Sequence, residues 1–381
     1  MMFQFIQEQK ELEHVLTLMS QQDVYGLDTE FIKVDTLWPK LGVLQINVAD
    51  QVFLLDGTRL DFSSFWPKVF AAKQNIFHAC GEDIDLIYHY SKGNHLNNVF
   101  DTQVALSFLG HGLQVSYQNA LKEILNIEID KDQTRSDWLA RPLTEEQKTY
   151  AANDVLYIMN LADALKNELE KKGHYQYVLE DCKSLTLEIA TETPKEKLYE
   201  DVGNYRHSRK QLMQLQLLSV WREEMVKALN QPRSFILKNA TMIDLVEKNP
   251  KNTFQLSQVK NIRPNVVREH GKTILDIIAL LPPMEEWPLR IARPIKHSSK
   301  DITHDVDNMI GNLAEELVIP KEVLMRKKWL GALYQHVVFH GDEQDLPQYL
   351  LGWRYDLLTK PLIELLHKDA QYLSMQMKVN E

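Results

Sequence analysis

Leu27-Asp28-Thr29-Glu30-Phe31 places two carboxylates two residues apart, at the end of an apolar run that is typical of a β-strand. Side chains at positions i and i+2 of a strand point to the same face of the sheet. Two like charges held side by side repel, and a divalent cation such as Mg²⁺, which takes oxygen ligands, would compensate them. The alternative interpretation is a solvent-facing strand end with two ordinary acids.

The segments around this strand predict an α/β sheet with helices on its faces. Three strand-like runs separated by short gaps indicate an antiparallel meander: residues 24–31, 42–48 and 52–55. Helical spacing over residues 7–20 precedes them, and strands and helices alternate after residue 60: helix 62–72, strand 75–80, helix 83–90, strand 98–100 and helix 101–109. The capping-box pattern from Thr144 to Gln147 predicts a helix that runs to about Lys171.

A chain of 381 residues exceeds one ordinary core, so we expect two or three domains. Strand patterns become scarce beyond residue 205. Two similar sets of helical patterns follow, and in each a glycine precedes the last apolar helix: Gly271 in the first set and Gly352, 81 residues later, in the second. A weak repeat of this kind predicts two small all-α domains of one type. The expected organisation is an α/β domain at 1–190, a linker at 191–205, a helical domain at 206–290, a linker at 291–300 and a second helical domain at 301–375.

The net charge of −10 is unevenly distributed. Residues 1–190 carry 16 Lys and Arg against 28 Asp and Glu, whereas residues 206–290 carry 14 against 8. The acidic part is suited to holding cations and the basic part to attracting a polyanion, although surface charge also varies by chance. No apolar run reaches the roughly 18 residues of a membrane span, and the first ten residues lack a signal-peptide pattern. With only Cys80 and Cys182, we expect free thiols and a cytoplasmic location.

Two further acids are candidates for the same site as the strand pair. Asp83 follows the predicted buried strand 75–80, and Asp154 shares a helical face with Tyr150 four residues earlier. Four carboxylates so close together could not all stay ionised without cations, and two Mg²⁺ or Mn²⁺ ions would satisfy them. Two such ions, about 3.5–4 Å apart, activate water and stabilise the leaving oxygen of a displacement at phosphorus. Tyr150 would then orient the attacking water.

Each member also has an ordinary interpretation. Asp83 stands between Glu82 and Asp85, and an acidic cluster there complements a helix dipole. Asp154 is equally compatible with a solvated helix position, and Tyr150 with a half-buried core aromatic. The catalytic interpretation therefore depends on the acids as a set.

Three motifs resemble those of the bacterial ribonuclease D family: Leu27 to Phe31, Phe77-His78-Ala79-Cys80-Gly81-Glu82-Asp83, and Ser136 to Thr144 followed by Tyr150-Ala151-Ala152-Asn153-Asp154. The Tyr-x-x-x-Asp ending is similar to that of the DEDDy 3′-to-5′ exonucleases. Residues 206–290 resemble the helicase-and-ribonuclease-D C-terminal (HRDC) domain, and residues 300–375 resemble a more diverged copy. The family pattern selects Asp83 rather than Asp85.

This resemblance implies a ribonuclease H-like α/β exonuclease domain followed by two all-α HRDC domains. It implies a metal-dependent 3′-to-5′ exoribonuclease that trims RNA 3′ ends, typically of tRNA precursors, and releases nucleoside 5′-monophosphates. Catalytic roles fall on Asp28, Glu30, Asp83, Tyr150 and Asp154, with the four acids as metal ligands. His78 and Asp101 look structural, and Thr29, Phe31 and Gln45 are candidates for contact with the terminal nucleotide.

The basic segment supplies candidate phosphate contacts, although ordinary helix-surface charge is the better explanation for any one of them taken alone. They are Arg206, Arg209, Lys210, Arg222, Arg233, Lys238, Arg263, Arg268 and Lys272. Two other functions stay open at this point: a DNA-directed exonuclease with the same site, and a catalytically silent RNA-binding scaffold. We expect a monomer.

Overall fold

The computed structural model describes residues 3–129, 136–295 and 297–377. The chain forms two compact units. Unit 1 comprises Met1–Ile32, Pro39–Thr191 and His297–Ala370, and unit 2 comprises Lys33–Trp38, Glu192–Lys296 and Gln371–Glu381. The C-terminal helical segment 297–370 therefore packs with the α/β domain, in one unit.

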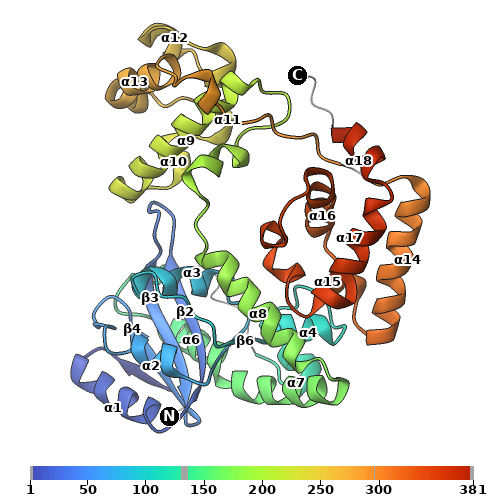
Figure 1. Ribbon diagram of the computed structural model, residues 1–381. Helices are drawn as coiled ribbons and strands as arrows, with labels where there is room; N and C mark the ends of the chain where they lie inside the picture. The colour runs from blue at the N-terminus through green and yellow to red at the C-terminus, as the bar shows by residue number, and fades with distance from the viewer. Residues whose placement is uncertain (1–2, 130–135, 296, 378–381) are drawn as a thin grey trace. The chain divides into compact units, whose positions relative to one another are not determined.

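A six-stranded mixed sheet forms the centre of unit 1, in the order β1-β4-β3-β2-β5-β6 (Figure 1). Its strands are β1 (Gln4–Ile6), β2 (Val24–Ile32), β3 (Lys40–Val48), β4 (Gln51–Asp56), β5 (Gln74–Phe77) and β6 (Val99–Asp101). The predicted antiparallel meander is confirmed, because β2 pairs with β3 and β3 with β4 in antiparallel register. The short parallel edge strand β1 was not predicted.

Eight helices of the α/β domain surround this sheet in the described part of the chain. They are α1 (Gln9–Met19), α2 (Trp66–Ala71), α3 (Gly81–Tyr90), α4 (Thr102–Phe108), α5 (Tyr117–Ala120), α6 (Glu145–Leu156), α7 (Ile158–Lys172) and α8 (Tyr175–Ala190). A π-helical turn, Leu121–Leu125, follows α5. The predicted capping box begins α6, since the Gln147 amide donates to Thr144 Oγ1 at 3.2 Å and the Thr144 amide donates back to Gln147 Oε1 at 3.0 Å.

The prediction of one continuous helix from residue 145 to 171 is wrong. The helix breaks at Tyr157, whose φ of −109° and ψ of 4° are not helical. The buried Asn47 on β3 provides the physical reason. Its side-chain amide donates to the carbonyl of Val155 at 3.0 Å and to that of Leu156 at 3.3 Å, which replaces helical bonds at this point.

The strand predicted over residues 75–80 ends earlier, at Phe77. The next residues form a turn in which Ala79 has a left-handed φ of 60°. Asp101 stabilises this turn, because its carboxylate accepts the amide hydrogens of Ala79 at 3.0 Å and Cys80 at 2.9 Å. A non-glycine residue in this conformation is uncommon, and the two hydrogen bonds offset its cost.

The C-terminal part of unit 1 is helical: α14 (Lys300–Leu317), α15 (Lys321–Leu324), α16 (Lys327–Phe339), a π-helical turn (Tyr355–Thr359) and α17 (Lys360–His367). One buried ion pair connects it to α8. Arg354 is 1% exposed, and both of its terminal nitrogens donate hydrogen bonds to the Asp181 carboxylate, with Nη2 lying 2.7 Å from Oδ2. Trp353 stacks on Tyr177 of α8 with ring centroids 4.3 Å apart.

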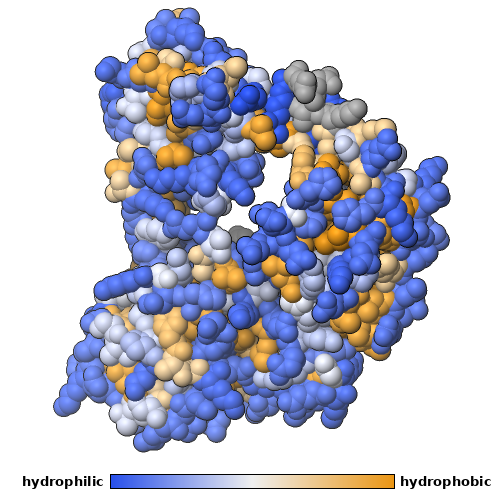
Figure 2. Space-filling view, viewed as in Figure 1, coloured by the Kyte–Doolittle hydropathy of each residue, from blue (hydrophilic) through white to orange (hydrophobic). Residues whose placement is uncertain are grey.

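Unit 2 contains a small helical bundle of α9 (Arg209–Leu229), α10 (Arg233–Ile236), α11 (Asn239–Lys248), α12 (Thr253–Ser257) and α13 (Pro264–Ala279). Its core is aliphatic, with Leu215, Leu218 and Leu245 fully buried. The last described helix of the chain is α18 (Ala370–Met377). Hydrophilic residues predominate on the face of the bundle drawn in Figure 2, with smaller hydrophobic areas between them.

Candidate active site

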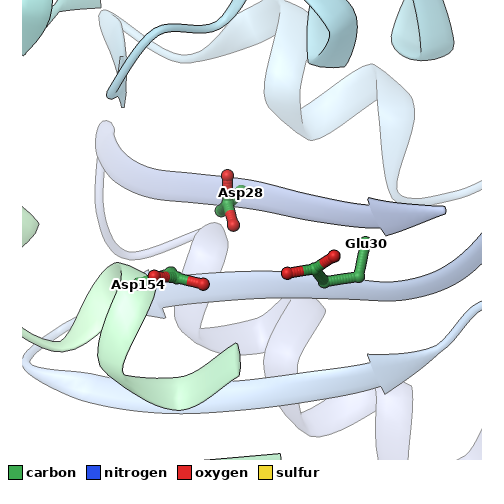
Figure 3. A group of neighbouring side chains, drawn as sticks. All are labelled: Asp28, Glu30 and Asp154. Atoms are coloured by element: carbon green, nitrogen blue, oxygen red, sulfur yellow. The ribbon is translucent and has the colours of Figure 1, made fainter. Parts of the chain in front are cut away.

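The two acids of strand β2 meet a third acid from helix α6. Ligand oxygens of Asp28, Glu30 and Asp154 all lie within 4.8 Å of one another, and the three side chains are half-buried. Figure 3 shows their carboxylates turned toward a common space between the strand and the helix. Oxygen atoms at such separations form the kind of donor set that Mg²⁺ and Mn²⁺ take. The three acids therefore fit a divalent metal ion.

Asp83 lies in the first turn of α3, and its side chain is buried. It lines the same pocket as the three clustered acids, a cavity of about 510 Å³, but its carboxylate is outside the group of mutually close oxygens. Instead it accepts a short hydrogen bond from the hydroxyl of Thr29, which lies between Asp28 and Glu30 on β2. Asp85 is not among the residues that line this pocket.

The pKa values of the acids show how strongly the site favours positive charge. Burial and repulsion by Asp154 and Asp83 raise the pKa of Glu30 to about 9. Burial and repulsion by Asp83 raise that of Asp154 to about 8. Burial, followed by repulsion from the other three acids, also raises the pKa of Asp28 well above its usual value. A bound cation would lower all of these values, because it stabilises the charged forms.

Tyr150 lines the pocket one helical turn before Asp154. Burial and the nearby carboxylates of Asp154, Glu30 and Asp28 raise the pKa of its phenol, so the hydroxyl stays protonated at neutral pH. It can therefore donate a hydrogen bond within the pocket. The ring lies 6.0 Å from that of the buried Trp138, measured between centroids.

Arg141 attaches the motif from Ser136 to Thr144 to the sheet. Its guanidinium donates to Asp56 through Nε at 2.8 Å and Nη2 at 2.6 Å. Burial would raise the pKa of Asp56, but these hydrogen bonds hold it below its usual range. Arg141 also donates to the carbonyls of Trp138 and Gly42, so the motif is fixed against β3 and β4.

His78 and Asp101 make structural contacts, as the family resemblance implies. Asp101 holds the turn that precedes Asp83, as described above, and His78 contacts Thr102 Oγ1 at 2.8 Å and the Val115 carbonyl at 2.9 Å. Tyr117 is a residue of the pocket that sequence reasoning missed. It lies 5.4 Å from the His78 ring, and it comes from a short helix after an irregular loop, where the sequence carries no periodic signal.

The three candidates for nucleotide contact have different surroundings. Thr29 and Phe31 line the pocket, beside the acids. Gln45 is 0% exposed and is not among the lining residues. Its side-chain amide lies against Asp28, so the burial of Gln45 argues against the expected contact with a nucleotide.

The candidate phosphate contacts of unit 2 are also unequal. Arg222 is 4% exposed, and its guanidinium donates inward to the Leu237 carbonyl and Asn239, so burial removes it from the set. Five other candidates are exposed: Arg233, Lys238, Arg263, Arg268 and Lys272. Of the three remaining cations, Arg206 and Lys210 are exposed, whereas Arg209 is half-buried and donates to the carbonyls of Pro288 and Trp287.

The fold and the acid cluster define a 3′-to-5′ exonuclease. Residues 3–170 match the family model described as 3′-5′ exonuclease, and residues 211–278 match the HRDC domain. The chain is 32% identical over 372 residues to ribonuclease D of Pseudomonas paraeruginosa, covering 95% of this chain and 97% of that one. It is 31% identical to ribonuclease D of Haemophilus influenzae, over 92% and 90% of the two chains. The chain thus belongs to the ribonuclease D family, and it is a metal-dependent 3′-to-5′ exoribonuclease.

Solved structures agree on the fold. The crystal structure of Escherichia coli RNase D, an exoribonuclease involved in structured RNA processing, superposes with a TM-score of 0.88 at 24% identity, over 96% of this chain and 99% of that one. The catalytic core of RRP6 from Trypanosoma brucei superposes with a TM-score of 0.57 at 19% identity, over 72% and 78% of the chains. Among the described helices, none is both long and apolar enough to cross a membrane.

Proposed function

We propose that this exoribonuclease trims the 3′ ends of tRNA precursors and other small stable RNAs by two-metal-ion hydrolysis, releasing nucleoside 5′-monophosphates. The observation that carries the proposal is the convergence of the Asp28, Glu30 and Asp154 carboxylates beside Asp83 and Tyr150 in one pocket. A set of acids that raise one another's pKa in this way is costly unless a cation is bound.

We assign the four acids as ligands of two Mg²⁺ or Mn²⁺ ions. When bound, such ions supply a hydroxide-like nucleophile and stabilise the charge on the transferred phosphate. The Tyr150 hydroxyl, which stays protonated, orients the attacking water by a hydrogen bond. Thr29 fixes the Asp83 carboxylate through its hydroxyl, and Phe31 offers an aromatic face for the terminal base.

The helical regions serve the same reaction. The proposed domain bounds stay 1–190, 206–290 and 301–375, with linkers at 191–205 and 291–300, and the third region is a second HRDC-like domain. In the first helical region, we assign phosphate contacts to the exposed Arg233, Lys238, Arg263, Arg268 and Lys272. Such contacts bind RNA without reading its sequence, which suits an enzyme that advances one nucleotide at a time. A monomer in the cytoplasm stays a prediction.

A time course on a 5′-labelled RNA with a 3′ extension tests the proposal. Parallel reactions contain Mg²⁺, Mn²⁺ or a chelator, and a DNA oligonucleotide of the same sequence serves as the substrate control. We expect a ladder that shortens one nucleotide at a time from the 3′ end of the RNA, only with metal. Full-length RNA in every lane, or faster loss of the DNA, would contradict the proposal.

A further inference from the structure

A second crevice, of about 290 Å³, adjoins the catalytic pocket, and Ala79 lines both. One wall belongs to the exonuclease domain and includes Gln103 and Asp181. The opposite wall belongs to the C-terminal helical segment of the same unit and includes Val323, Arg326 and Tyr349. The C-terminal segment thus contributes side chains to a crevice that adjoins the pocket of the acids.

The buried Arg354 fixes the position of this opposite wall. It donates to Asp181, which lines the crevice from the exonuclease side, as well as to the carbonyl of Val323 at 2.7 Å and that of Tyr349 at 3.3 Å. One guanidinium therefore ties both walls together. Since removal of either partner would leave a buried charge unpaired, the spacing of the two walls is strongly constrained.

Arg326 brings a positive charge into this crevice. Its guanidinium lies 4.8 Å from the ring centroid of Trp329 and 5.7 Å from that of Tyr349, so two aromatic faces hold it in place. Among the described residues, no carboxylate forms a salt bridge with it. In the part of the chain that the structure describes, no lysine and no other arginine lines either the crevice or the catalytic pocket. The cation is thus exposed, held by two aromatic rings, and part of a crevice that adjoins the acidic pocket.

We propose that this crevice binds the RNA backbone on the 5′ side of the scissile bond, with Arg326 contacting a phosphodiester. The inference rests on the proposed function, because RNA whose 3′ end lies against the four acids must leave the catalytic pocket along an adjoining surface. A guanidinium matches phosphate geometry through paired hydrogen bonds, which an ammonium cannot reproduce. Arg326 is then a substrate-binding residue supplied by the C-terminal helical segment.

The test compares Arg326→Ala with Lys360→Ala, which removes an exposed positive charge elsewhere in the same segment. Substrates are a dinucleotide and a decamer RNA of matched 3′ sequence, both with 5′-hydroxyl ends. We expect Arg326→Ala to raise KM for the decamer by about fivefold to tenfold, and to lower the decamer-to-dinucleotide ratio of kcat/KM. Lys360→Ala should leave both values near wild type. Arg326→Lys should be intermediate.

Binding gives a second readout that needs no turnover. In the Asp28→Asn background with chelator, Arg326→Ala should reduce the slope of log Kd against log salt for the decamer by about one. An unchanged KM and an unchanged salt slope would overturn the inference, as would an equal loss on the dinucleotide and the decamer. Failure of the wild-type enzyme to cleave either RNA would instead contradict the proposed function, and the salt slope would still decide the role of Arg326.

Discussion

At the scale of single residues, the clustered carboxylates repel one another when they are ionised, and a bound cation would remove this repulsion. Glu30 and Asp154 face each other across the pocket, and their pKa values are raised to about 9 and about 8 because burial and repulsion disfavour the charged forms. The same surroundings raise the pKa of the Tyr150 phenol, so its hydroxyl stays protonated and can donate a hydrogen bond. These side chains therefore determine which protonation states and hydrogen bonds the pocket offers.

The first prediction concerns pH. A carboxyl whose pKa is higher in the folded than in the unfolded state destabilises the metal-free protein above its unfolded pKa of about 4. This cost grows as pH rises and levels off at the folded value, about 8 for Asp154. We expect the Tm of the chelated protein to fall between pH 5 and pH 8, and Asp154→Asn to reduce that fall. A steeper fall in the variant would contradict the prediction. Added Mg²⁺ or Mn²⁺ should stabilise the wild type most at high pH, because metal ligation needs deprotonated acids.

The second prediction separates catalysis from binding. Asp28→Asn and Asp154→Asn each remove a proposed metal ligand while keeping nearly the same shape. We expect cleavage to fall below detection, while RNA affinity in chelator stays within about threefold of wild type. Asp85→Asn is the matched control, because Asp85 stands two residues after the proposed ligand Asp83 but does not line the pocket, and this variant should cleave normally. Near-normal turnover by either ligand variant would refute the assignment.

The third prediction tests the tyrosine. Tyr150→Phe removes only the hydroxyl that is proposed to orient water, so kcat should fall by roughly 10²-fold or more with little change in RNA affinity. Tyr175→Phe is the matched control, because its hydroxyl accepts a hydrogen bond from Gln74 outside the pocket. Single-turnover rates on one RNA check both variants. An unchanged rate in Tyr150→Phe would remove this residue from the mechanism.

At the scale of elements, the position of Asp154 depends on where α6 ends. The helix breaks at Tyr157, and the next helix begins directly over strand β2. Gly26 of β2 permits this approach, since a Cβ added there would lie 2.3 Å from Cγ2 of Ile158. Because α7 begins this close to β2, the end of α6 that carries Asp154 is held near the acids of β2.

Gly26→Ala should therefore displace the start of α7 and disturb the helix that carries Tyr150 and Asp154. We expect a loss of about 1–3 kcal/mol in the free energy of unfolding, together with a lower kcat. Gly331→Ala is the control, because a Cβ at that helical position meets no atom within 4 Å. It should be neutral or stabilising by up to about 1 kcal/mol. Urea unfolding measures both, and equal effects of the two substitutions would contradict the packing argument.

At the scale of the whole molecule, the C-terminal helical segment is part of the same compact unit as the exonuclease domain. A single buried ion pair, Arg354 with Asp181, dominates the polar contacts between them, reinforced by the stack of Trp353 on Tyr177. Buried pairs of this kind confer little net stability over an apolar replacement, but they are costly to break. In this unit, the Arg354–Asp181 pair fixes the position of the C-terminal helical segment relative to the exonuclease domain.

Arg354→Met should consequently destabilise unit 1 by about 3–5 kcal/mol, because it leaves Asp181 buried without its partner. The double variant Arg354→Met with Asp181→Leu removes both charges and should recover a large part of the loss. Thermal unfolding of the two variants and the wild type measures the effect. A double variant that is as unstable as the single one would show that packing, and not the unpaired charge, accounts for the cost.

The sequence by itself determined the family and part of the fold: the motifs that carry the four candidate acids and Tyr150, the antiparallel meander, and the helix that begins after Thr144. These features depend on side-chain type and on periodicity over a few residues. Only the tertiary structure decided that Gln45 and Arg222 are buried, that Asn47 ends α6, and that Arg326 lies beside the catalytic pocket. Burial and pairing between residues more than 100 positions apart depend on how elements pack, and no local pattern in a sequence records that packing.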